Sequence, residues 1–226
     1  MLSLITAALL TLQPGAAEPE PLSAPPGEVL FAAMGGERAE RMRRCGVDAD
    51  ELHRLIGLEP RAFDQDFAGG WRPYADAPGC ERAAAELIIA YISHSPHYDP
   101  QSHAIIRWHA GQMLASADER DLAVEYLDST RSGHLAWNLY IDATIAFLRS
   151  DREAAEAARA ELARQLPSEA EMASRRQFLA NNPRITMPEG FVERPQNLDV
   201  VDGLLACWGR PYSQAYGRCD ADDAED

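Results

Sequence analysis

The chain has 226 residues, with 21 basic and 36 acidic side chains and a formal net charge of −15. This length suffices for one substantial domain or for a compact array of helical repeats. Nucleic-acid binding needs a basic face that releases counterions, and no cluster of arginines outweighs its acidic neighbours, so the charge argues against a nucleic-acid partner. Helix-favouring Ala, Leu, Arg and Glu dominate, and runs of Val, Ile and Thr are scarce. The composition predicts an all-α protein.

The two ends of the chain differ in composition from the rest of the sequence. Residues 1–17, MLSLITAALLTLQPGAA, are an apolar stretch with small residues near a cleavage point, which is typical of a signal peptide and too short for a membrane anchor. The alternative is a buried N-terminal helix, because no Arg or Lys precedes the stretch. Residues 18–27 predict a proline-rich linker and residues 220–226 an acidic, disordered tail. We expect a periplasmic or secreted protein without an integral membrane segment after cleavage.

Between these ends, residues 28–219 predict a single all-α helical-repeat domain. Apolar residues recur at helical spacing, and Gly or Pro interrupts the pattern between segments. The segment at 100–116 is expected to begin at Pro100 with Asp99 as its N-cap, and the segment at 197–209 is expected to be capped by Asn197. The expected helical segments are 28–46, 48–60, short pieces within 61–80, then 81–95, 100–116, 118–131, 133–150, 151–166, 167–182 and 197–209, with a last turn at 211–219.

The four cysteines are an even set without a C-x-x-C pair, which suits an oxidising compartment. Four cysteines allow three pairings. We favour Cys45–Cys80 and Cys207–Cys219, because each joins segments near in sequence and should contribute about 3 kcal/mol in the loop-entropy description. The alternative is four reduced, buried thiols.

Two consecutive helical segments have a recurring order of small and large residues. Gly111 and Leu114 on the first are followed by Ala123 and Leu127 on the second. This order resembles the tetratricopeptide-repeat family, best over residues 102–131 and more weakly over 135–166. The resemblance implies antiparallel helical hairpins stacked as a short superhelix; the alternative is an unrelated all-α bundle. The pattern departs from the family at Trp108, one place late, and at the missing proline after Thr130.

Four of the six histidines lie within residues 94–109. Zinc ligands on one helix need spacings of three or four, whereas His103 and His109 are six apart. A loop site could still use His94, His97 and Asp99, and a small periplasmic enzyme or metal-binding protein built on them is our alternative hypothesis. We prefer the interpretation that this segment is a turn between two helices, with no metal and no cofactor.

The other candidate catalytic residues have structural explanations. Asp64 and Asp66 alternate with phenylalanines in FDQDF, which we expect to form a structural corner with Trp71, and nothing in the sequence indicates a buried acid. Asp199 and Asp202 suit the first turn of a helix. Serine-nucleophile and nucleotide-binding motifs are missing from the sequence. We therefore expect a protein that is not an enzyme.

Stacked hairpins of the implied kind expose one face of each first helix to a concave groove. In that register, Trp108 and Gln112 face the groove from one hairpin, and Asn138 and Asp142 from the next. An aromatic anchor beside amide and acid groups suits a peptide backbone, so the sequence predicts binding of a protein or peptide partner. The alternative is that these side chains pack against adjacent hairpins.

Overall fold

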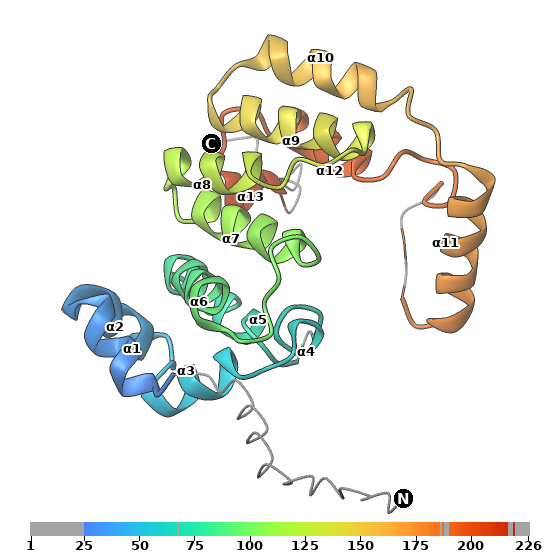
Figure 1. Ribbon diagram of the computed structural model, residues 1–226. Helices are drawn as coiled ribbons and strands as arrows, with labels where there is room; N and C mark the ends of the chain where they lie inside the picture. Colours follow the sequence, from blue (N-terminus) through green and yellow to red (C-terminus); the bar gives the residue numbers. More distant parts are fainter. Residues whose placement is uncertain (1–24, 67, 186, 188–189, 217–218, 220–226) are drawn as a thin grey trace, which may run out of the picture.

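The computed structural model describes residues 25–66, 68–185, 187, 190–216 and 219, and in these the chain is helical without strands (Figure 1). The predicted all-α class is confirmed. The signal peptide, most of the linker and the acidic tail lie outside the described residues. The helices are α1 (Gly27–Met34), α2 (Gly36–Arg44), α3 (Ala49–Ile56), α4 (Pro60–Asp64), α5 (Arg72–Ala75), α6 (Glu81–His94), α7 (Ala104–Ser116), α8 (Arg120–Asp128), α9 (Leu135–Leu148), α10 (Arg152–Leu162), α11 (Glu169–Asn181), α12 (Leu198–Ala206) and α13 (Tyr212–Tyr216).

The N-terminal half forms its own apolar core from α1 to α6 and one side of α7. The segment expected at 28–46 is divided into α1 and α2 at Gly35, which has a φ of 83°, a value that L side chains rarely adopt. Asp48 caps α3 by accepting a hydrogen bond from the Glu51 amide. The buried Glu86 carboxylate on α6 pairs with Arg41 on α2, and this ion pair ties α2 to α6.

The C-terminal half has a second core, in which α7 packs on α8 and α9 on α10. Both pairs are joined by very short links, so each forms a helical hairpin. The expected close approach within the first hairpin is present at Gly111. A Cβ there would lie 2.7 Å from Leu127 Cδ2, too near for any larger side chain without rearrangement.

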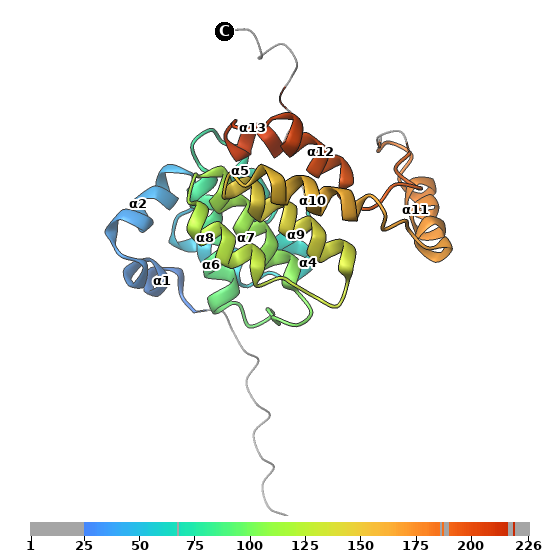
Figure 2. The same ribbon diagram turned by 90° about the horizontal axis from the view of Figure 1, so that it is seen from above.

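The last helices return to this core. Helix α12 packs against α9 and α10, and α13 packs against α12 and α7 (Figures 1 and 2). Helix α11 stands apart from the other helices in both views and has no buried residue. Its first turn is fixed by a capping box between Ser168 and Glu171. None of the described helices is long and apolar enough to cross a membrane.

The cysteines pair as predicted. Cys45 joins Cys80 and so ties the end of α2 to the start of α6, whereas Cys207 joins Cys219 across the C-terminal turn. Neither pair leaves a free thiol among the described residues.

One predicted helix start is wrong, and one predicted N-cap residue is in place without a capping hydrogen bond. Helix α7 begins at Ala104, because Asp99 instead accepts hydrogen bonds from the amides of Gln101 and Ser102 and holds residues 99–102 in a turn. Asn197 precedes α12 in a left-handed conformation, with a φ of 63°, and its side chain makes no capping hydrogen bond. Short polar side chains satisfy turns as readily as helix ends, so their type alone does not locate a helix start.

Replacing Gly111 by Ala tests the close approach of α7 and α8. The added Cβ would also lie 3.2 Å from the backbone nitrogen of Leu127, a residue that is fully buried. Overpacking of about 1–3 kcal/mol outweighs a gain in helix propensity of about 1 kcal/mol. We expect urea denaturation of Gly111→Ala to show a net loss of about 1 kcal/mol.

Gly36→Ala is the matched control, because a Cβ at the start of α2 meets nothing within 4 Å. Its free energy of unfolding should be unchanged or slightly higher. Equal losses in the two variants would show that α7 and α8 are not in tight contact.

Candidate binding cleft

Two of the predicted groove residues are buried. Trp108 is 2% exposed and Gln112 is 6% exposed. The Trp108 ring centroid lies 4.8 Å from those of Trp137 and Tyr140 on α9, and the Gln112 amide approaches the Tyr212 hydroxyl on α13 at 3.4 Å. The prediction that these side chains face an open groove is therefore wrong, and the alternative that they pack against neighbouring helices holds.

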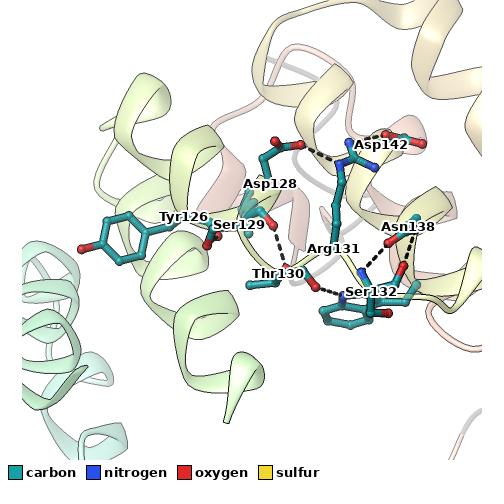
Figure 3. A network of polar contacts seen from close by, with 10 residues as sticks. Tyr126, Asp128, Ser129, Thr130, Arg131, Ser132, Asn138 and Asp142 are labelled. Atoms are coloured by element: carbon teal, nitrogen blue, oxygen red, sulfur yellow. Dashed lines mark hydrogen bonds and ion pairs between the residues drawn. The ribbon is translucent and has the colours of Figure 1, made fainter. Parts of the chain in front are cut away.

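The other two predicted residues lie elsewhere, beside the loop between α8 and α9 (Figure 3). The Asn138 side chain accepts a hydrogen bond from the Ser132 amide at 3.0 Å and donates one to the Ser132 carbonyl at 2.8 Å. Asp142 binds Arg131 at 2.6 Å, and Arg131 also binds Asp128 at 2.7 Å. These contacts fix the loop.

Helix geometry explains why the four residues do not share a face. On α9, the side chains beside Trp108 are Trp137 and Tyr140, and Tyr140 is 2% exposed. Asn138 and Asp142 are each two positions from Tyr140, which corresponds to about 200° around the helix. The predicted register was therefore wrong for α9.

A cleft lies instead between the body of the protein and α11. One part of it is a cavity of about 610 Å³, lined by the start of α7, the α8–α9 loop, the start of α9 and the link before α11. Ile105, Leu135 and Leu166 line it, and they are 40%, 58% and 73% exposed. Large aliphatic side chains exposed in one concavity are a feature of binding surfaces.

A second cavity of about 470 Å³ continues the cleft along α11. Phe191 and Val200 contribute apolar surface to it, and Gln196 and Asn197 border both cavities. Arg175 on α11 donates hydrogen bonds to the carbonyls of residues 191, 192 and 194, so α11 is tied to the segment that returns to the body.

Two charged side chains that line both cavities, Glu171 and Arg175, are engaged in local hydrogen bonds. Glu171 accepts hydrogen bonds from the Ser168 amide and hydroxyl, and these bonds hold the pKa of Glu171 below its usual range. The Arg175 guanidinium is engaged with backbone carbonyls. The first cavity thus offers aliphatic side chains and the amides of Gln196 and Asn197, and the second cavity is also lined by the charged residues Arg194 and Asp199.

The histidine-rich segment does not gather into a metal site. His94 is exposed, His97 Nδ1 lies 3.1 Å from Glu59, and Asp99 accepts the two turn amides. In the part of the chain that the structure describes, three or more His, Cys, Asp or Glu side chains do not converge as ligands would. The preferred turn interpretation agrees with these contacts.

One carboxylate was misjudged, because Asp64 is 1% exposed. Its Oδ1 lies 2.6 Å from His109 Nδ1 on α7 and accepts a hydrogen bond from Trp71 Nε1 at 2.9 Å, while Oδ2 accepts one from Gln65. Burial raises the pKa of the Asp64 carboxyl, but the hydrogen bonds from His109, Trp71 and Gln65 outweigh burial and leave this pKa below its usual value.

A carboxylate that orients a histidine is one part of a catalytic triad. Among the described residues, however, no serine or cysteine is hydrogen-bonded to His109. The Asp64 and His109 pair joins the predicted structural corner to α7. It thus explains the polar density of the segment around Trp71 as a packing feature.

No family model matches this chain, and neither a curated protein nor a solved structure matches it.

Replacing Asp64 by Asn tests the corner. Loss of a buried, charge-assisted hydrogen bond costs about 1.5–3 kcal/mol. The folded-state pKa of Asp64 is lowered, so its stabilisation is present in full above the unfolded-state pKa of about 3.9 and is lost as the pH falls through the lower folded-state value. Thermal unfolding should show a gap between wild type and Asp64→Asn that is constant near neutrality and closes below about pH 4.

Asp66→Asn serves as the control, because Asp66 is exposed in the same segment. It should remain close to wild type at every pH. A gap for Asp64→Asn that does not change with pH would show that the carboxylate charge is not what stabilises the corner.

Proposed function

We propose that this chain is an exported, non-catalytic helical protein that binds an apolar peptide segment of a protein partner in the cleft beside α11. The observation that carries the proposal is the convergence of Ile105, Leu135 and Leu166. These side chains come from three separate parts of the chain and are exposed in a single cavity. Burying one such side chain on binding is worth about 1.5–3 kcal/mol.

The polar groups of the cleft support a peptide ligand. The amides of Gln196 and Asn197 border both cavities, where each offers a donor and an acceptor of the kind that a peptide backbone needs. The cavities together extend along α11, so a ligand longer than one residue fits the arrangement. An extended segment with apolar side chains on either side of its backbone matches this chemistry.

Rigid support of the cleft also favours binding. The α8–α9 loop is held by Asn138 and Arg131, and Trp137 donates a hydrogen bond to the Thr130 carbonyl at 2.9 Å (Figure 3). A preformed surface loses less conformational entropy when a ligand binds. In this proposal, Asn138 and Asp142 do not contact the ligand. They support the loop that lines the cleft.

The tetratricopeptide-like arrangement and export are parts of the same proposal. The close packing at Gly111 supports stacked hairpins of that kind. Two disulfides support an oxidising compartment, which is the periplasm or the cell exterior.

The test uses a random 12-residue peptide library displayed on phage and the immobilised full-length protein. We expect enrichment of peptides with two or more large apolar residues. Leu135→Asp should weaken their binding about 10-fold or more, because an aliphatic contact is lost and a charge is placed in the cleft. Leu135 is the first residue of α9, where an acid is compatible with the helix, so folding should be preserved.

Val29→Asp is the matched control. Val29 is 59% exposed against 58% for Leu135, and it also lies in the first turn of a helix, on the other core. Binding unchanged by Leu135→Asp, or weakened equally by Val29→Asp, would remove the cleft as the binding site.

A further inference from the structure

The face of α7 that the sequence predicted to line an open groove, with Trp108 and Gln112, is covered by the chain itself. Trp108 and Tyr140 lie in one core with Tyr212 of α13, Gln112 lies beside Tyr212, and each of the four is less than a tenth exposed. The Gln112 amide approaches the Tyr212 hydroxyl, and burial beside Tyr212 and Tyr216 raises the pKa of Tyr140. Helix α13 therefore occupies the place that a partner would take.

Helix α13 is too short to hold this position by helix formation alone. It has five residues, whereas isolated helices below about 12 residues are marginal in water. Its fixed connection is the Cys207–Cys219 disulfide, whose members are separated by 12 positions and enclose α13. Closing such a ring restricts the conformations of the open chain and so favours the docked one.

We propose that the Cys207–Cys219 disulfide is a latch, and that its reduction by a dithiol releases α13 and uncovers a second binding face, lined by Trp108, Gln112 and Tyr140, for a peptide that presents a tyrosine. The face is separate from the cleft beside α11 and does not depend on the function proposed there. The tyrosine follows from the present occupant, because the Tyr212 hydroxyl meets the Gln112 amide and Tyr212 shares an apolar core with Trp108 and Tyr140.

The two sulfurs of this disulfide belong to residues that differ in solvent exposure, and this difference suits thiol–disulfide exchange. Cys219 is partly exposed, whereas Cys207 is 3% exposed. A thiolate of the dithiol attacks the Cys219 sulfur, the disulfide breaks, and Cys207 leaves as a thiolate. The Cys219 amide donates a hydrogen bond to Cys207 Sγ, which stabilises this leaving group. The second thiol of the reductant then displaces Cys219, so two protein thiols form and the dithiol becomes a cyclic disulfide.

The first test is amide hydrogen exchange in the full-length double variant Cys207→Ser/Cys219→Ser. We expect exchange in α7 and α9 to be at least 10-fold faster than in wild type, while exchange in α3 is unchanged, because α3 belongs to the other core. The matched control is Cys45→Ser/Cys80→Ser, which should leave protection of the α7 and α9 face intact. Unchanged exchange in α7, or faster exchange throughout the chain including α3, would overturn the latch.

The second test measures what the uncovered face binds. A fluorescent peptide with the sequence of residues 208–216 is added to oxidised wild type, to wild type reduced by dithiothreitol, and to the Cys207→Ser/Cys219→Ser variant. Saturable binding is expected in the last two samples and absent from the first, and the peptide with Tyr212→Ala should bind at least 10-fold more weakly. Equal binding to oxidised and reduced protein, no binding to any sample, or no effect of Tyr212→Ala would overturn the proposal.

Discussion

The packing of helix α7 is the constraint on which the arrangement of the other helices depends, because α7 contributes residues to both apolar cores. Gly111 lets it approach α8 at Leu127, His109 binds the Asp64 corner, and Gln112 meets α13. A helix that is enclosed in this way must carry small, aromatic and polar residues on separate faces, each matched to a different neighbour. Both cores include residues of this helix, so the two cores are joined through it.

The sequence was informative where local rules decide the outcome. The helices follow apolar spacing, Gly35 breaks the first long segment, and the two disulfides join the cysteines nearest in sequence. It was misleading where burial depends on distant partners. The FDQDF segment gives no local sign that Asp64 is enclosed and Asp66 is not, because the difference arises when Trp71 and α7 close over one carboxylate.

The predicted groove failed for a related reason. A periodic pattern identifies which face of an amphipathic helix is buried, but α7 and α9 have apolar residues around much of their circumference, and such helices have no single exposed face to predict. The cleft beside α11 was missed because its aliphatic side chains lie at helix starts and in a link. Leu166, an apolar residue just before Pro167 in a polar segment, was the one local signal that could have pointed to it.

The protein thus has two apolar surfaces, of which one is covered and the other is open to solvent. The aromatic face of α7 and α9 is covered by a segment of the same chain and closed by a covalent bond, whereas the aliphatic cleft beside α11 is left open. Aromatic side chains bury large apolar areas in contacts, and large exposed apolar patches promote aggregation. Covering the aromatic face is therefore compatible with an open cleft, in which, under the proposed function, the placement of Ile105, Leu135 and Leu166 selects the ligand.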